Sequence, residues 1–352
     1  MMRMAGSRGI VLVHEFVTGG GLAGRPIPPS LAAEGHAIRR ALAADFSTRD
    51  DLQVVMTLDS RLPDEPGPWE VLRVGPGEEL EAFAHHAGEA HYTVLVAPET
   101  GGILFERAKA IHQVGGRSLG SEPDAIALAA DKLMMSMHLS AARIPTPPSQ
   151  RVVPVEGLPQ DFSYPAVLKP VDGAGSLQTF LVLGPGPVPA EARSLPEAIL
   201  QPYIPGTPMS ASFLVGAEGR SILLGVGRQW VDQVGGRFTY KGGTVPSRSR
   251  VPTDAAQRAI DSIPGLRGWV GVDFIWEEGS PEITVLEVNP RVTTSYIGLR
   301  TLVADGALAW NWLAGLYDPS LYNAKYWAAR IRAHKPVSFA ADGTILPEGS
   351  IP

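Results

Sequence analysis

The chain has 352 residues, of which 44% are hydrophobic and 19% charged, a composition typical of a globular protein with room for two or three domains. Acidic residues outnumber basic ones by 36 to 30, which argues against general binding of nucleic acid or anionic membranes. The absence of cysteine excludes disulfides, thiol nucleophiles and Cys-ligated metal sites, and fits a cytoplasmic address. We find no apolar stretch with the length of a signal sequence or a membrane span.

The first third of the chain alternates strand patterns with helix patterns. Strands are expected at 9–16, 51–60, 92–99 and, briefly, 117–121, and helices at 30–46, 79–91 and 103–116. Ser30 is the expected N-cap of the first helix, and the stretch after residue 60 reads as a Pro-rich loop. This alternation predicts a parallel, Rossmann-like α/β domain over residues 1–122.

The remainder reads as an α+β region. A long helix is expected over 123–143, followed by a linker at 144–150 and then short strands with Gly-rich turns. A last helical stretch is expected at about 303–332. The predicted units are a small subdomain at 123–200, a larger one at 201–333 and an irregular tail at 334–352.

Two predicted strands, GWVGVDFIW (268–276) and EITVLEVNP (282–290), flank a turn near Gly279. Their polar residues stand at positions that place them on one face of each strand. An even register about that turn makes Asp273 and Glu287 diagonal neighbours on one face. Two carboxylates with the amide of Asn289 form a hard oxygen site, which suits Mg²⁺ or Mn²⁺. The alternative is a set of structural ion pairs, with Arg291 as one of the cations.

The stretch VLKPVDGAGS (167–176) ends a strand at Lys169 and continues into a loop with Gly173, Gly175 and Ser176. Glycine backbone N–H groups and a lysine suit phosphate oxygens, and such a loop can act as a lid over a nucleotide. A simple β-turn is the alternative. Lys132 is either a second phosphate contact or a surface lysine.

These pieces occur in a known order: a helix with Asp131-Lys132, LKP with its Gly-rich loop, LQPYIPG, VDF and LEVNPR. Over residues 95–318 this order resembles the ATP-grasp superfamily of carboxylate–amine ligases. The first domain resembles the N-terminal substrate domain of that superfamily. The resemblance implies a two-part ATP-grasp domain with antiparallel sheets, and ATP with Mg²⁺ or Mn²⁺ as cofactors.

The resemblance also implies roles for particular residues. It implies that Lys132 and Lys169 contact the ATP phosphates. It also implies that the loop with Gly173, Gly175 and Ser176 is the lid. The adenine hinge falls on Gln201, Tyr203 and Ile204. The metal ligands fall on Asp273, Glu287 and Asn289, and contacts to the reacting groups on Arg291, Lys241 and, more weakly, Arg228.

The sequence departs from the family pattern at two positions of the nucleotide site. Gln201 stands where many relatives have Glu, although its amide oxygen can still accept a hydrogen bond from the adenine amino group. Pro208 stands where many relatives have a ribose-binding Glu, which leaves Ser210 or Ser212 as substitutes.

A narrower resemblance rests on VHEFVTGGGL, APETGGILFERA, YKGGTVPSR and NPRVTTSYIGL. These stretches are similar to the ligases that join tyramine to the γ-carboxylate of L-glutamate in methanofuran biosynthesis. The reaction implied is amide formation through an acyl phosphate, with release of ADP and phosphate. Another amino acid and amine pair, or a catalytically silent nucleotide-binding sensor, is the alternative.

Glu15 and Glu99 follow strands of the first domain, at the edge where α/β proteins bind ligands. They are candidates for binding a substrate ammonium group, and solvated loop carboxylates are the alternative reading. The protein is expected to act on small molecules, with a homodimer as a compatible state.

GGGLAG (19–24) matches the dinucleotide-binding pattern, which makes an NAD(P)-binding oxidoreductase the rival enzyme class. The context argues against it, because the expected helix starts near Ser30 rather than at the third glycine. Asp59 follows the last glycine by 59 − 24 = 35 residues, against about 20 in that motif. His85, His86 and His91 are read as a solvated helix surface rather than a metal site.

Overall fold

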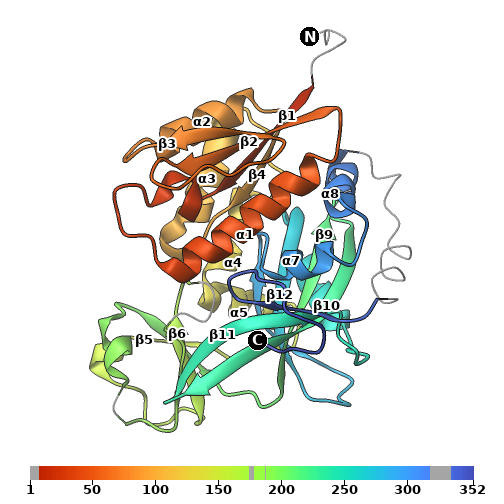
Figure 1. The fold of residues 1–352 in the computed structure, drawn as a ribbon. Coiled ribbons are helices and arrows are strands. Elements are labelled where there is room, and N and C mark those ends of the chain that lie inside the picture. The colour runs from red at the N-terminus through yellow and green to blue at the C-terminus, as the bar shows by residue number, and fades with distance from the viewer. Residues whose placement is uncertain (1–7, 174–177, 187, 318–333) are drawn as a thin grey trace.

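The computed structural model describes residues 8–173, 178–186, 188–317 and 334–352. These residues form a parallel sheet of four strands and an antiparallel sheet of ten, with helices around and between them (Figure 1). The expected α/β part followed by an α+β part is therefore confirmed. No helix in the described ranges combines the length and apolar character needed to cross a membrane.

The N-terminal sheet has the strand order β3-β2-β1-β4, and all neighbouring strands are parallel. Its strands are β1 (Gly9–Glu15), β2 (Leu52–Asp59), β3 (Trp69–Val74) and β4 (Tyr92–Val96). Two expectations were wrong. Strand β3 lies in the stretch predicted as a loop, and the strand predicted at 117–121 makes only a single bridge, Thr93 with Ser118.

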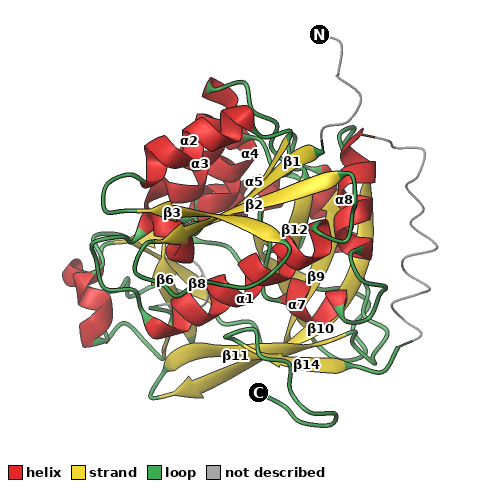
Figure 2. Ribbon diagram, turned by 45° about the horizontal axis from the view of Figure 1, so that its top comes forward, coloured by secondary structure: helices red, strands yellow, loops and turns green. Residues whose placement is uncertain are grey.

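Three helices accompany this sheet: α1 (Pro29–Phe46), α2 (Glu79–Glu89) and α3 (Ile103–Gln113). Ser30 is not the N-cap of α1, because Pro28 holds that position and no side chain caps the helix. Pro29 suits the first turn, where its missing N–H would have no helical partner. Figures 1 and 2 show α1 running between the four-stranded sheet and helix α7 (Ser295–Arg300) of the second part.

The long helix predicted over 123–143 is two helices, α4 (Pro123–Ala130) and α5 (Lys132–Ala141). Asp131 separates them in an extended conformation, and its side chain accepts hydrogen bonds from the backbone N–H groups of Leu133 and Met134. A carboxylate in this position satisfies the free N–H groups of a helix start. The break places Lys132 at the first turn of α5.

The large sheet has the order β13-β12-β9-β10-β11-β7-β6-β8-β5, with β14 paired to β11. All of its recorded pairings are antiparallel. The strands are β5 (Gln150–Val152), β6 (Ala166–Pro170), β7 (Phe180–Val182), β8 (Ala198–Pro202), β9 (Thr207–Val215), β10 (Ser221–Val234), β11 (Arg237–Val245), β12 (Gly268–Trp276), β13 (Thr284–Asn289) and β14 (Val337–Ala340).

The even register predicted for the acidic hairpin was wrong in detail. Asp273 pairs directly with Glu287, whereas the next pair is Phe274 with Val285. Leu286 is therefore an extra residue on β13, a β-bulge that changes which side chains share a face. The two carboxylates are direct cross-strand neighbours rather than diagonal ones.

The C-terminal part adds α6 (Asp254–Asp261) and α8 (Ala307–Tyr317) to α7. Helix α8 confirms the start of the helix predicted at 303–332, whose remainder falls at 318–333, outside the described residues. The tail predicted as irregular contains β14, and Phe339 of this strand is buried in the main core. The predicted subdomain boundaries at 122, 200 and 333 stay predictions.

One buried apolar cluster joins the two parts of the chain. Leu42 and Phe46 of α1 belong to the same cluster as Trp269 of β12, Tyr296 of α7 and Trp312 of α8. Burial of large side chains is the main source of stability in such a core. The N-terminal sheet is therefore packed against the second part, and the polar residues at their junction are held in place.

Candidate active site

Asp273 and Glu287 face each other at the centre of the site. Asp273 accepts hydrogen bonds from the Gln229 amide at 3.0 Å and from the Asn289 amide at 3.1 Å. Burial and the neighbouring Glu287 raise the pKa of Asp273 to about 7, although Ser210, Asn289 and Gln229 hydrogen-bond to it and lower it. Two carboxylates this close favour binding of a metal ion, which would relieve their repulsion.

Two lysines lie beside these carboxylates. The Lys132 ammonium is 3.8 Å from a Glu287 oxygen and donates a hydrogen bond to the Gly173 carbonyl at 2.6 Å. Lys169 is buried, and this burial lowers its pKa to about 8 while Glu287 opposes the shift. Burial alone would raise the pKa of Glu287, but Lys132 and Lys169 outweigh it and keep that pKa low. The predicted phosphate contacts thus meet the predicted metal ligands.

The start of the predicted lid also contacts the N-terminal part. Asp172 accepts a hydrogen bond from the backbone N–H of Gly101 at 2.7 Å. Gly101 has a φ of 63°, a conformation that favours glycine. Gly175 and Ser176, predicted as part of the same lid, lie outside the described residues.

Arg291 reaches across to the N-terminal part and pairs with Glu99. Its Nε donates to both carboxylate oxygens of Glu99, at 2.8 and 2.9 Å. Glu15 instead accepts hydrogen bonds from the backbone N–H groups of Val17 and Thr18 and from the Thr18 hydroxyl. Both glutamates are buried, so the reading of solvated loop carboxylates was wrong. Glu15 is held by its own turn, whereas Glu99 faces the site.

A cavity joins residues from both parts of the chain. Its lining is Glu99, Ala129, Ala130, Lys132, Gly173, Glu287, Val288 and Asn289. Among the described residues the cavity thus combines two predicted metal ligands, a predicted phosphate lysine and a predicted substrate carboxylate. Carboxylate and amide oxygens beside lysines are the donor set expected for Mg²⁺ with a polyphosphate.

Gln229 and Tyr240, the strand neighbours of the predicted Arg228 and Lys241, lie near Asp273 and were not predicted from the sequence. Gln229 reaches Asp273, and successive side chains of a strand alternate, so Arg228 lies on the other face, against the Trp230 ring. Tyr240 interacts with Asp273 and hydrogen-bonds with Thr294, whereas the exposed Lys241 ammonium lies 3.7 Å from Asp232. The roles of Arg228 and Lys241 at the reacting groups stay predictions.

The hinge residues lie at the end of β8. Gln201 is buried and donates its side-chain amide N–H to the Ser149 hydroxyl at 2.7 Å. Tyr203 donates its backbone N–H to the Pro165 carbonyl, and its ring stacks on Phe238. Ile204 follows as a half-buried residue. Their adenine-binding role stays a prediction.

The two residues proposed for ribose differ in their surroundings. Ser210 hydrogen-bonds to Asp273, within the carboxylate cluster. Ser212 is buried, and its hydroxyl lies 2.8 Å from the hydroxyl of Ser295. Ser212 therefore serves the contact with α7.

The glycines at 19–24 form a packed turn. A Cβ on Gly21 would meet the Phe16 ring at 2.3 Å, and one on Gly20, whose φ is 108°, would meet Val74 at 2.5 Å. Helix α1 starts at Pro29 and not at Gly24, so the helix N-terminus that holds a dinucleotide pyrophosphate is missing here. These contacts favour the turn reading over the dinucleotide reading.

The predicted histidine cluster is divided. His85 and His86 lie on α2 near Glu89, with His85 exposed, whereas His91 accepts a hydrogen bond from the backbone N–H of Ile10. The reading of a solvated helix surface was therefore wrong for His91, which lies beyond the end of α2 and is half-buried, and it stays a prediction for His85 and His86.

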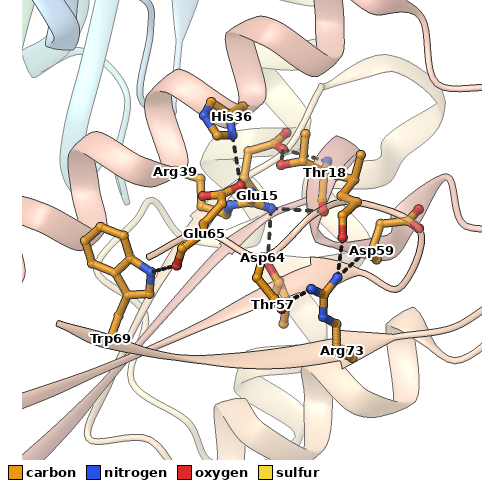
Figure 3. A network of polar contacts seen from close by, with 11 residues as sticks. Glu15, Thr18, His36, Arg39, Thr57, Asp59, Asp64, Glu65, Trp69 and Arg73 are labelled. Carbon is orange, nitrogen blue, oxygen red and sulfur yellow. Dashed lines mark hydrogen bonds and ion pairs between the residues drawn. The ribbon is translucent and has the colours of Figure 1, made fainter. Parts of the chain in front are cut away.

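A buried polar network fixes the turn that carries Glu15 (Figure 3). Arg39 is fully buried, donates to the backbone carbonyls of Thr18 and Thr57, and pairs with Glu65. Burial lowers the pKa of Arg39, whereas Glu65 and Glu15 raise it. Glu15 thus has a cation nearby, which it shares with Glu65.

Comparison with known proteins agrees with this architecture. Residues 129–295 match a family model described as ATP-grasp domain, and residues 52–126 match one described as pre ATP-grasp 3 domain. A putative ATP-grasp superfamily protein from Archaeoglobus fulgidus has a similar structure, with a TM-score of 0.65 and 23% identity over 88% of this chain and 89% of that one. An L-amino acid ligase from Bacillus licheniformis gives a TM-score of 0.67 at 15% identity, over 95% and 80% of the two chains.

Two curated relatives are tyramine–L-glutamate ligases. The one from Methanocaldococcus fervens is 28% identical over 218 residues, which are 60% of this chain and 62% of that protein. The one from Methanocaldococcus jannaschii is also 28% identical over 60% of this chain, and the match spans 58% of its length. The matched segment therefore spans about three fifths of these relatives. This chain belongs to the ATP-grasp proteins, with a pre-ATP-grasp domain ahead of its ATP-grasp domain.

Proposed function

We propose that the protein is an ATP-dependent ligase that joins a carboxylate to an amine, with the γ-carboxylate of L-glutamate and tyramine as the substrate pair. The observation that carries this proposal is the pairing of Asp273 with Glu287 beside Lys132 and Lys169. Such a site suits the metal complex of a nucleoside triphosphate. The named pair comes from the two 28%-identical relatives.

Asp273, Glu287 and Asn289 would hold the metal ion. When bound, Mg²⁺ or Mn²⁺ would neutralise phosphate charge and stabilise charge that develops during phosphoryl transfer. Lys132 and Lys169 would contact the phosphates as fixed positive charges. The hinge at Gln201, Tyr203 and Ile204 would hold the adenine.

The reaction follows from the poor reactivity of a carboxylate. A carboxylate oxygen of the acid attacks the γ-phosphorus of ATP, so that an O–P bond forms and the bond to ADP breaks. The uncharged amine then attacks the acyl carbon, a C–N bond forms, and phosphate leaves with the bridging oxygen. The nitrogen releases its proton, and the products are an amide, ADP and phosphate.

Arg291 lies where this chemistry needs a cation. Burial opposes its charge, but the carboxylates around it, foremost Glu99, raise its pKa, so the guanidinium stays charged. We propose that it contacts the carboxylate or the acyl phosphate. The lid over the cavity would exclude water, which would otherwise hydrolyse the intermediate.

The proposal is tested by measuring phosphate release from ATP and Mg²⁺ with L-glutamate and tyramine, beside each single omission. Release that needs both, with a product mass equal to their sum less water, is expected. Release that depends on neither would mean an ATPase with other substrates. No release with this pair or with a panel of amino acids and amines would contradict the ligase and favour a nucleotide-binding sensor.

A further inference from the structure

Glu34, near the start of α1, lies beside the segment that carries Arg291 and Thr294. One of its carboxylate oxygens accepts a hydrogen bond from the Thr294 hydroxyl at 2.7 Å. Its carboxylate also interacts electrostatically with Arg291, Glu99 and Glu15. Glu99 lines the cavity and pairs with Arg291, so Glu34 lies near a residue pair that borders the site.

Tyr240 links Glu34 to the metal ligands. It interacts electrostatically with both Glu34 and Asp273, and hydrogen-bonds with Thr294. Glu34 and the predicted metal ligands therefore lie around a common set of residues, although they come from opposite ends of the chain. A molecule bound beside Asp273 would therefore be close to residues that also surround Glu34.

Glu34 differs from the fully buried carboxylates in its charge balance. Among the described residues, five of the six fully buried carboxylates form an ion pair with an arginine: Asp45 with Arg300, Asp59 with Arg61, Glu65 with Arg39, Glu79 with Arg107, and Glu99 with Arg291. The sixth, Glu15, accepts three hydrogen bonds from its own turn. Glu34 interacts electrostatically with Arg291 but forms no ion pair with it among the described contacts. The Nε of Arg291 instead donates to both carboxylate oxygens of Glu99. Among the described residues, the Thr294 hydroxyl is the one side chain that forms a hydrogen bond with Glu34.

The position of Glu34 is fixed by the packing of α1. Glu34 and Asp45 are separated by 45 − 34 = 11 residues, which is about three helical turns, so they share a face of the helix. At the far end of this face Asp45 bonds to Tyr296 and Arg300 of α7. A carboxylate held rigidly without its own cation is preorganised to receive one.

We propose that Glu34 binds an ammonium group of a substrate. This inference rests on the proposed ligase function and deepens it, because both substrates of such an enzyme can carry an ammonium group. Tyramine carries its reacting amine, and L-glutamate carries its α-ammonium. Charge-assisted hydrogen bonds to a carboxylate are the usual means of recognising such a group.

The test is the Glu34→Gln variant, which removes the charge but keeps an oxygen for Thr294. Two reactions are compared, both with ATP, Mg²⁺ and L-glutamate at neutral pH. In one, tyramine is the nucleophile. In the other it is hydroxylamine, which is uncharged at this pH and traps an acyl phosphate as a hydroxamate. Asp45→Asn, on the same face of α1, is the matched control for disturbance of the helix.

We expect Glu34→Gln to lower kcat/KM for a cationic substrate by about 10- to 100-fold. Loss confined to tyramine, with hydroxamate formation intact, would assign the ammonium to the amine. Loss in both reactions with a raised KM for L-glutamate would assign it to the acid. The kcat/KM of Asp45→Asn should stay within about twofold of the wild-type value in both reactions.

If kcat/KM of Glu34→Gln stays within about twofold of wild type in both reactions, the proposal for Glu34 is overturned, whereas the proposed ligase function is not affected. Absence of hydroxamate with the wild-type protein would instead contradict the proposed ligase with this acid, and the Glu34 assignment with it. The two failures are therefore distinguishable.

Discussion

The two ends of helix α1 carry carboxylates with opposite surroundings. Asp45, at the C-terminal end, receives hydrogen bonds from the Tyr296 hydroxyl at 2.6 Å and from two nitrogens of Arg300. Glu34, at the N-terminal end, receives one from the uncharged Thr294 hydroxyl. Both contacts join α1 to the segment around α7. A paired carboxylate stabilises the fold, whereas one that lacks a cation leaves room for a ligand.

The same contrast separates two larger regions. In the pre-ATP-grasp domain, Glu79 forms an ion pair with Arg107. Burial alone would raise the pKa of Glu79, but hydrogen bonds from His14 and Arg107 outweigh it and lower this pKa to about 2. In the ATP-grasp domain, burial and Glu287 raise the pKa of Asp273 to about 7. Substitution of Glu79 should therefore change mainly stability, whereas substitution of the facing carboxylates Asp273 and Glu287 should change mainly turnover.

The largest effect is expected at Glu287. Glu287→Gln should reduce turnover by at least about 100-fold, because it removes one of two facing carboxylates from the proposed metal site. The thermal unfolding midpoint should change little or rise. The exposed Glu282→Gln on the same hairpin is the control and should keep its turnover. Near-normal turnover of Glu287→Gln, measured by phosphate release, would contradict the metal assignment.

The next effect is on stability, at Glu79. A pKa of about 2 against 4.5 in the unfolded chain corresponds to about 3 kcal/mol of stability at neutral pH. Because the folded-state pKa is the lower one, this contribution is complete above pH 4.5 and is lost as the pH falls towards about 2. Glu79→Gln should therefore lose stability at pH 7 but little near pH 2.

Denaturant unfolding of wild type and Glu79→Gln across this pH range measures the difference. A difference that does not change with pH would show that packing, rather than charge, is responsible.

Asp45→Asn should lower the free energy of unfolding by about 2 kcal/mol, because it weakens charged hydrogen bonds from Arg300. Its turnover should be normal below the unfolding temperature. Denaturant titration and steady-state kinetics measure the two properties. A large loss of kcat/KM at unchanged stability would mean that Asp45 belongs to the site rather than to the fold.

The smallest effect on stability, of opposite sign, is expected for Glu34→Gln, which should raise the free energy of unfolding by up to about 1 kcal/mol. Burial raises the pKa of Glu34, with Thr294 and Arg291 lowering it only in part, so its charge is unfavourable in the fold. The gain should be present at neutral pH and vanish as the pH falls through the folded-state pKa and wild-type Glu34 takes up a proton. Destabilisation at neutral pH would show that Glu34 is a structural carboxylate like Asp45.

The sequence predicted the central residues because a strand pattern places them. Asp273, Glu287 and Asn289 follow from the period of two, and the structure brings them together with Lys132 and Lys169. The bulge at Leu286 was not predictable from that period, because the flanking turn does not fix where an extra residue lies.

Two kinds of information were missing from the sequence. The first is which of two adjacent strand residues faces inward. Arg228 and Lys241 were predicted as site residues because they are cations, whereas their neighbours Gln229 and Tyr240 lie near Asp273. The second is contact over long separation. Nothing local to Glu34 indicates that it meets Thr294, since that contact depends on how α1 packs on the second part of the chain.

The fold shows the same limits. Strand β3 was missed because prolines and glycines surround its short apolar pattern, which resembled a loop. The break at Asp131 was missed because its flanks are both strongly helical, and only the capping contacts identify it as a helix start.

The most direct test of the account follows the oxygen atoms of the acid. L-Glutamate labelled with a heavy oxygen isotope in its carboxylates is incubated with ATP, Mg²⁺ and tyramine, and the released phosphate is analysed by mass spectrometry. If the site phosphorylates a carboxylate, the phosphate carries a labelled oxygen for each amide formed. Amide formation with unlabelled phosphate would contradict the acyl-phosphate chemistry assigned to this site.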